Sequence, residues 1–162
     1  MPLASTFRFL LPLLLLLSCK ESDLPVIQNP TVDPPASPTA KTYLALGDSY
    51  TIGENVAAED RFPVLLSQQL TERGFEIAPP RIVAQTGWRT DNLQEAIASR
   101  DLAAPYDLVS LLIGVNNQFQ DKPIEEYETD FLALVETAIE LAGGEKEKII
   151  ILSIPDYAFT PF

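Results

Sequence analysis

Short apolar runs alternate along the chain with longer stretches in which apolar residues recur at helical spacing. The runs are almost continuously apolar, which is typical of strands that are covered on both faces. They are Tyr43–Leu46, Ile82–Gln85, Leu108–Ile113 and Ile149–Ser153. The pattern therefore predicts strands of a sheet that is buried on both faces.

The segments between these runs carry apolar stripes with the period of an α-helix. The stripes are Phe62, Leu65, Leu66 and Leu70; Leu93, Ala96 and Ile97; and Ile124, Tyr127, Phe131, Leu134, Val135, Ala138 and Leu141. Pro63 and Pro123 suit the first turns of the first and last helices. Glycines follow both of these helices and suit their ends. We therefore expect a helix in each connection between strands.

Strands that alternate with helices indicate a parallel sheet with right-handed crossovers. The predicted fold class is α/β: a three-layer α/β/α domain with a doubly wound, flavodoxin-like parallel sheet. The run Ile149–Leu152 is flat and apolar, which is typical of an interior strand. If the domain ended at Phe162, this strand would lie at an unprotected edge, which natural proteins avoid. We therefore expect the domain to be truncated at its C-terminus in this sequence.

The N-terminus has a different composition. Leu10–Leu17 is apolar except for one proline, and Arg8 precedes it. This run is too short to cross a bilayer, which takes about 20 helical residues, and it is typical of a secretory signal. The signal resembles the bacterial lipoprotein type, in which cleavage precedes a cysteine that is then lipidated. That resemblance implies a signal peptide over residues 1–18 and lipidation of Cys19, the only cysteine. An ordinary signal peptide with an incidental cysteine is the alternative.

Residues 19–40 are rich in proline, which opposes helix formation and favours extended conformers. We interpret this segment as a tether between an acylated cysteine and a domain that spans residues 41–162. The expected location is the bacterial cell envelope, after export, with a membrane anchor at Cys19. A single thiol also excludes a disulfide within the chain.

The net charge of −12 makes nucleic acid and anionic lipid poor partners. The sequence has no histidine and one cysteine, and its carboxylates fall mainly on the outer faces of the predicted helices. No glycine-rich phosphate loop follows the first strand. We therefore expect neither a metal nor another cofactor.

Candidate chemistry lies where the predicted strands end. Ser49 follows the first strand, Gly87 the second and Asn116 the third. In open parallel sheets, ligands bind beyond the carboxyl ends of the strands. Together these residues offer a hydroxyl, an unobstructed backbone N–H and a carboxamide donor, which is the set that ester hydrolysis needs. Taken singly, each residue is typical of a turn.

These segments resemble the SGNH hydrolases, also called GDSL-type esterases or lipases. Gly47–Gly53 resembles their first block, Gly87 matches the second-block glycine, and Gly114–Asn117 resembles the third block. The resemblance implies that Ser49 is the nucleophile and forms an acyl-enzyme with a small-molecule or glycan ester. It also implies an oxyanion hole formed by the N–H groups of Ser49 and Gly87 and the side chain of Asn116.

The sequence departs from this family in two places. The third block commonly reads Gly-x-Asn-Asp, and Asn117 stands in the last position, a change that we expect to be minor. The family's base is a histidine in a late Asp-x-x-His block, which this sequence lacks, so we expect the fragment to be inactive. A serine–lysine pair with Lys122 is a further alternative. We interpret Asp48 as shaping the turn rather than as the catalytic acid.

Other interpretations stay open. The chain could be a non-catalytic envelope binding module or a pseudoenzyme on the same fold. A flavodoxin-like nucleotide binder is a third possibility, although the missing phosphate loop argues against it. Trp88 and Phe119 follow two of the site loops and could line a pocket or simply pack. We expect the charge of Arg89 to be solvated.

Overall fold

The computed structural model describes residues 39–155. The predicted signal peptide, Cys19 and nearly all of the tether lie outside the described residues, as does the segment after Pro155. All described residues belong to one compact unit. Between residues 39 and 155, no helix combines the length and the apolar character needed to span a bilayer.

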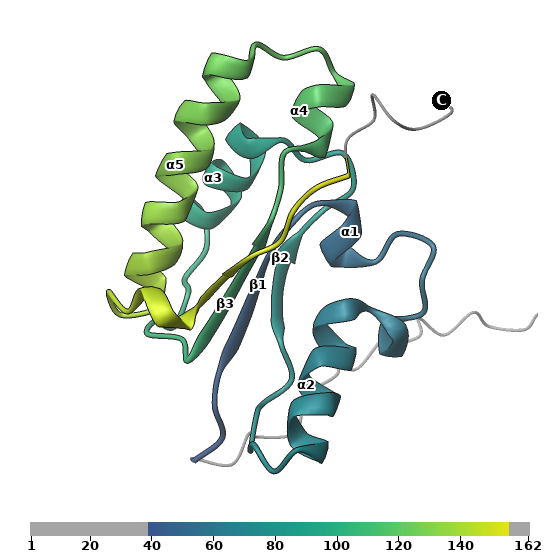
Figure 1. Cartoon of the computed structure of the whole chain (residues 1–162), viewed down its shortest axis with the longest axis vertical. Coiled ribbons are helices and arrows are strands. Elements are labelled where there is room, and N and C mark those ends of the chain that lie inside the picture. The colour runs from purple at the N-terminus through teal and green to yellow at the C-terminus, as the bar shows by residue number, and fades with distance from the viewer. Residues whose placement is uncertain (1–38, 156–162) are drawn as a thin grey trace, which may run out of the picture. The chain divides into compact units, whose positions relative to one another are not determined.

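A parallel sheet of four strands forms the centre of the domain, as Figure 1 shows. Its strands are β1 (Tyr43–Gly47), β2 (Arg81–Ala84), β3 (Leu108–Leu112) and β4 (Ile149–Ile151), in the order β2-β1-β3-β4. β1 lies between β2 and β3 and is buried at every residue. The predicted strands are therefore confirmed, with ends that differ by one or two residues.

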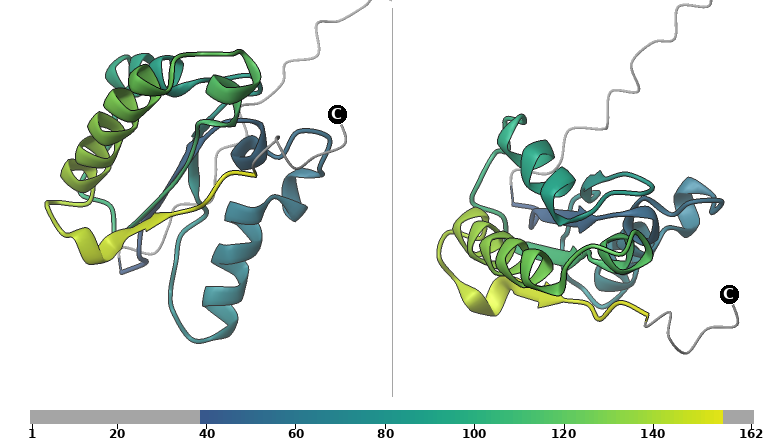
Figure 2. Two further views of the ribbon diagram at one scale, coloured as in Figure 1. Left: turned by 45° about the horizontal axis from the view of Figure 1, so that its top comes forward. Right: turned by 90° about the horizontal axis from the view of Figure 1, so that it is seen from above.

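Helices cover both faces of this sheet (Figure 2). α2 (Phe62–Glu72) links β1 to β2 and lies on one face. α3 (Thr90–Ala98) and α5 (Ile124–Leu141) lie side by side on the other face. The helices fall on the two faces because the crossovers are right-handed and the chain reverses its direction across the sheet after β2. The three-layer, doubly wound α/β fold is confirmed.

Two short helices were not predicted. α1 (Ser49–Ile52) follows β1, and α4 (Val115–Phe119) follows β3. Two 3₁₀ turns, η1 (Ala58–Asp60) and η2 (Lys146–Lys148), precede α2 and β4. Each of these elements is about one turn long, so none contains enough positions for an apolar stripe to repeat.

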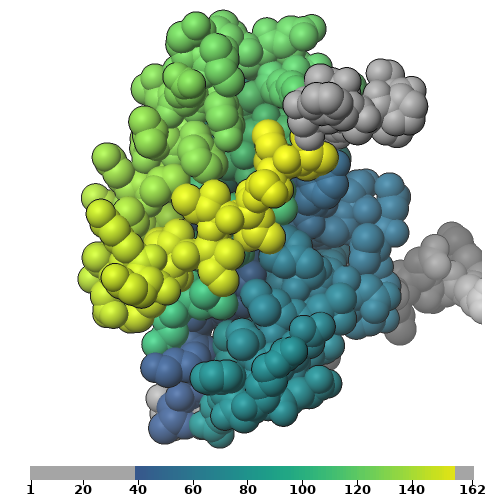
Figure 3. All heavy atoms as spheres, viewed as in Figure 1, coloured from purple at the N-terminus to yellow at the C-terminus, as the bar shows by residue number. Residues whose placement is uncertain are grey.

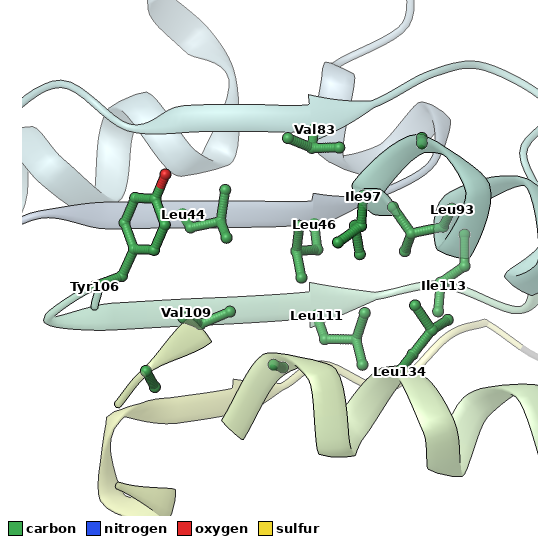
Figure 4. Packing of buried hydrophobic residues seen from close by; sticks show 13 residues of the cluster. Leu44, Leu46, Val83, Leu93, Ile97, Tyr106, Val109, Leu111, Ile113 and Leu134 are labelled. Carbon is green, nitrogen blue, oxygen red and sulfur yellow. The ribbon is translucent and has the colours of Figure 1, made fainter. Parts of the chain in front are cut away.

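The main core lies between the sheet and the α3–α5 layer (Figure 4). Alternate residues of β1 and β3 point into it from the sheet, and buried side chains of α3 and α5 meet them. Its buried members are Leu44, Leu46, Val83, Leu93, Ala96, Ile97, Tyr106, Val109, Leu111, Ile113, Leu134, Ala138 and Ala142. The stripe predicted for α3 is buried throughout, whereas Ile124 at the start of α5 is 59% exposed because it lies at the edge where the strands end.

The opposite face of the sheet is packed less deeply. Here the hydroxyl groups of Tyr43 and Ser110, both buried, share a hydrogen bond of 2.8 Å. α2 buries Pro63 and Ser67, while Leu65 of the predicted stripe is 38% exposed. The apolar stripe predicted for α2 is therefore rotated relative to the face that the helix buries, because α2 turns its smaller residues toward the sheet.

The apolar composition of β4 indicated an interior strand of a longer domain, and an edge strand if the domain ended at Phe162; the second arrangement is observed within residues 39–155. Among the described residues it pairs only with β3, so it forms an edge of the sheet. Ile150 and Ile151 are 44% and 50% exposed, and Figure 3 shows this part of the chain, in yellow, at the surface. An apolar run indicates a tendency to be buried but does not specify a place in the strand order.

Leu134→Ala tests the core. Leu134 is fully buried on α5, so its truncation leaves a cavity, and we expect the free energy of unfolding to fall by about 2–5 kcal/mol. Leu132→Ala is the matched control on the same helix, because Leu132 is 64% exposed and should change stability by less than about 0.5 kcal/mol. Urea unfolding followed by circular dichroism measures both. Equal losses would contradict the assignment of the buried face of α5.

Candidate active site

The turn after β1 places Ser49 at the first position of α1. Asp48 is the N-cap residue, and its Oδ1 accepts a hydrogen bond of 3.1 Å from the N–H of Tyr50. Gly53 ends the helix in the left-handed conformation and donates its N–H to the Ser49 carbonyl at 3.0 Å. Asp48 therefore shapes the turn, as the sequence indicated. Among the described residues, the Ser49 hydroxyl has no hydrogen-bond partner.

Gly47 is required by close packing behind this turn. A Cβ atom at Gly47 would lie 2.1 Å from the Thr51 Oγ1 and 2.4 Å from the carbonyl oxygen of Leu112. Real Cβ atoms do not approach other atoms this closely. The absent side chain therefore lets α1 fold back against the ends of β1 and β3, and this fixes the position of Ser49.

Asp48 is an ionisable residue whose side chain is fully buried. Burial raises the pKa of its carboxyl from the ordinary 3.8 to about 6, although hydrogen bonds from backbone N–H groups, including that of Tyr50, act in the opposite direction. Its Oδ2 atom is buried without a partner among residues 39–155. Ionising Asp48 in the folded state is therefore costly, and among residues 39–155 its hydrogen bonds are to backbone N–H groups of the turn.

Gly87 lies in the turn that follows β2. Its φ angle of +82° is in the region that favours glycine, and a Cβ atom there would meet nothing within 4 Å. The neighbouring Trp88 N–H bonds back to the Gln85 carbonyl at 3.2 Å and closes the turn. The Gly87 backbone is thus open to a ligand from one side, as a hydrogen-bond donor to an oxyanion would have to be.

Asn116 lies in the first turn of α4, after β3. Its Nδ2 donates to the Trp88 carbonyl oxygen at 2.9 Å. A carbonyl can only accept, so this contact sets which end of the amide is the nitrogen. One N–H of Asn116 holds the neighbouring loop, and the second is left to serve as a donor.

The loops after β1, β2 and β3 are joined by further side-chain contacts. The Thr86 hydroxyl bonds to the Glu54 carboxylate, which links the loops after β1 and β2. Gln120 of the third loop donates to the Gly87 carbonyl at 3.4 Å. It also accepts from Arg89 at 2.8 Å. Sequence reasoning missed Glu54, Thr86 and Gln120, since isolated polar residues in loops give no pattern.

The expectation of a solvated Arg89 was wrong. Its guanidinium forms an ion pair of 2.5 Å with Asp91, and its side chain is only 22% exposed. Trp88 packs against the core and lies under the guanidinium of Arg100, with 5.6 Å from that group to the ring centroid. Phe119 is 71% exposed.

The position after Asn116 is more constrained than the sequence suggested. Asn117 is only 4% exposed. Its Oδ1 accepts from the Thr90 N–H at 3.1 Å, and its Nδ2 donates to the Thr90 Oγ1 at 2.8 Å. Thr90, at the start of α3, is fully buried and donates its hydroxyl to Asp130 on α5 at 3.0 Å.

A hollow of about 510 Å³ lies beside this position, at the carboxyl ends of β3 and β4. Gly114, Asn117, Gln118, Asp121, Lys122, Ile124, Tyr127, Ile154 and Pro155 line it. Lys122 is thus placed in this hollow, and no hydrogen bond joins it to Ser49 among the described residues. The part of the chain that the structure describes also holds no group of three potential metal ligands.

Comparisons with known proteins bear on the family and the fold. The sequence model of the GDSL-like lipase/acylhydrolase family matches residues 45–162. No curated protein matches the sequence.

Solved structures share the fold. TesA superposes with a TM-score of 0.63 at 16% identity, over 75% of this chain and 65% of TesA. AlinE4, an esterase of the SGNH-hydrolase family, superposes with a TM-score of 0.55 at 19% identity, over 71% of this chain and 59% of AlinE4. The psychrotrophic esterase EstA from Pseudoalteromonas sp. superposes with a TM-score of 0.54 at 18% identity, over 70% of this chain and 60% of EstA. The chain therefore spans less than two thirds of the length of each of these proteins.

Asp48→Asn tests the buried carboxyl. Because the folded pKa is about 6 and the unfolded value about 3.8, the native state holds the proton more tightly. The contribution of this residue to stability is therefore fully present below pH 3.8 and is lost as the pH rises through 6. The shift corresponds to about 3 kcal/mol. We expect the stability of the variant, relative to the wild type, to rise by about this amount between pH 4 and pH 8.

Urea unfolding at several pH values measures this difference. Any fixed cost of the new amide group is the same at each pH and cancels from the comparison. A difference that stayed constant with pH would show that Asp48 titrates normally.

Proposed function

Because the chain belongs to the GDSL-like lipase/acylhydrolase family, we propose that it carries the nucleophile and the oxyanion hole of a serine ester hydrolase. The placement of Ser49, Gly87 and Asn116 at the carboxyl ends of three adjacent parallel strands supports this proposal. The resemblance seen in the sequence is confirmed at the level of family and fold.

The proposed reaction has two steps. The Ser49 oxygen attacks the ester carbonyl, its proton passes to a base, and the carbonyl oxygen becomes an oxyanion held by the N–H groups of Ser49 and Gly87 and by Asn116. Collapse of this intermediate breaks the ester bond, and the alcohol leaves with a proton. Water then attacks the acyl-enzyme and releases the acid and free Ser49. The reaction exchanges no electrons and calls for no cofactor.

The proposed reaction needs a general base, and the printed sequence contains no histidine that could serve as one. General base catalysis contributes about 10²–10⁴-fold to rate. We therefore propose that the 162-residue chain turns esters over slowly. The family pattern points to an Asp-x-x-His block as the source of the base in an active enzyme.

We also propose a place for this activity. A lipid on Cys19 and a proline-rich tether would hold the domain at the cell envelope. The net charge of −12 favours a small neutral or glycan ester over an anionic polymer or a nucleic acid.

A second function is favoured by one observation. The Ser49 hydroxyl has no hydrogen-bond partner among the described residues, which suits a non-catalytic binding module or pseudoenzyme. The two functions differ in whether Ser49 can be acylated or phosphonylated.

A fluorophosphonate probe separates them. We expect the protein from the complete reading frame to be labelled at Ser49, identified by mass spectrometry, and the 162-residue chain to react about 10²–10⁴-fold more slowly. Ser49→Ala should abolish labelling, whereas Ser99→Ala, a change at the far end of α3, should not. If the complete protein stays unlabelled, the binding module is the better interpretation.

Asn116→Ala tests the oxyanion hole. In the protein from the complete reading frame, we expect kcat for a chromogenic acetate ester to fall by about 10²–10³-fold, the usual effect of losing one donor. KM should change little, because the donor acts on charge that develops in the transition state. A change confined to KM would assign Asn116 to substrate binding instead.

A further inference from the structure

Two neighbouring asparagines hold the same neighbouring segment. Asn116 donates to the Trp88 carbonyl, and Asn117 forms a closed pair of hydrogen bonds with the N–H and hydroxyl of Thr90. These contacts join the loop that carries Gly87 to the turn that carries Asn116. The separation of the two proposed oxyanion donors therefore depends on this clamp.

The hydrogen bonds of the clamp have a defined direction. The Nδ2 of Asn117 can only donate, so the Thr90 oxygen accepts from it. The single hydroxyl hydrogen of Thr90 is then left for the Asp130 carboxylate, 3.0 Å away. The chain of donors runs from Asn117 through Thr90 and ends at the carboxylate.

Asp130 is itself held in place. The Gln94 side chain on α3 donates to the backbone carbonyl of Asp130 at 3.0 Å, across the contact between α3 and α5. This contact ties the α5 backbone at Asp130 to α3, next to the point where the Asp130 carboxylate meets Thr90. The acceptor at the end of the donor chain is built into the helix layer.

A carboxylate at position 117 would break this order. Residue 117 and Asp130 would then both require the one hydrogen of Thr90, and two negative charges would face the same hydroxyl, which is itself fully buried, at a part-buried contact. An unsatisfied buried acceptor costs about 1–3 kcal/mol, and more when it is charged. An amide at 117 and a carboxylate at 130 are therefore compatible, whereas two carboxylates are not.

We propose that Asn117 is a positioning residue for the oxyanion-binding loops and that Asp130, acting through Thr90, dictates an amide at position 117. This inference rests on the proposed function for the role of the loops, and on the hydrogen-bond geometry alone for the pairing of residues 117 and 130. Asn117 acts by holding Asn116 and Gly87 at their working distance and does not touch substrate.

The test compares Asn117→Asp, Asp130→Asn and the double variant. The double variant reverses the donor chain: an amide at 130 donates to Thr90, which donates to a carboxylate at 117. Glu126→Gln, an exposed change on α5, is the matched control for loss of a charge. Trp88 is the only tryptophan and lies in the clamped loop, so its quenching by acrylamide reports the loop position in the 162-residue chain.

We expect Asn117→Asp to make Trp88 more accessible to acrylamide, or to prevent folding, and the double variant to restore the wild-type quenching. In the protein from the complete reading frame, fluorophosphonate labelling of Ser49 should fall by about tenfold or more in Asn117→Asp, since small displacements of reacting groups carry large penalties. The double variant should recover most of that loss. Asp130→Asn alone should have a smaller effect, because the new amide oxygen still accepts from Thr90.

Two results would overturn the proposal. A double variant as impaired as Asn117→Asp would show that Asp130 does not dictate the residue at 117. An Asn117→Asp variant with unchanged Trp88 quenching would show that the clamp does not position the loop. Trp88 quenching decides the inference even if the complete protein is never labelled at Ser49, a result that would reject only the proposed hydrolase.

Discussion

The parallel alignment of β1 between β2 and β3 is the constraint on which the rest of the site depends. Gly47, the last residue of β1, is paired with Ala84 on one side and with Leu112 on the other, so three strands end at one edge. If either neighbour ran the other way, its last residue would lie at the opposite edge, about 16 Å away for a strand of five residues. Parallel pairing is therefore what brings a hydroxyl, a bare backbone and an amide together from distant parts of the sequence.

Hydrogen bonds then fix the positions of the loops that the sheet brings together. Strand pairing fixes where each loop begins, but the loops beyond it are joined by side chains that bond to backbone, as Asn116 does to Trp88. Buried polar groups need partners, and satisfying them restricts the loops to one arrangement. The α3–α5 layer takes part, because Thr90 and Asp130 belong to these helices and bond near the site. The layer that contributes most of the core thereby also determines the geometry of the loops.

The fold could be predicted from the sequence because its signals extend over several residues in each element. The strands are continuous apolar runs and the three long helices repeat a helical apolar spacing, whereas α1 and α4 are too short to repeat one. Ser49, Gly87 and Asn116 could be predicted as candidates because each directly follows a predicted strand. The link between Asn117 and Thr90 could not, since it joins residues 27 positions apart and depends on how two helices pack. The strand order β2-β1-β3-β4 could not be predicted from composition, which does not encode the order of strands in a sheet.

The exposed edge at β4 has a consequence for the behaviour of the chain in solution. Among residues 39–155, β4 pairs on one side only, and its exposed isoleucines beside that open side form a surface to which a second copy can add a strand. A net charge of −12 opposes that encounter by repulsion between copies. The repulsion acts over about 30 Å at 0.01 M salt but only about 3 Å at 1 M. Colloidal stability of this chain is therefore a balance that ionic strength can tip toward association.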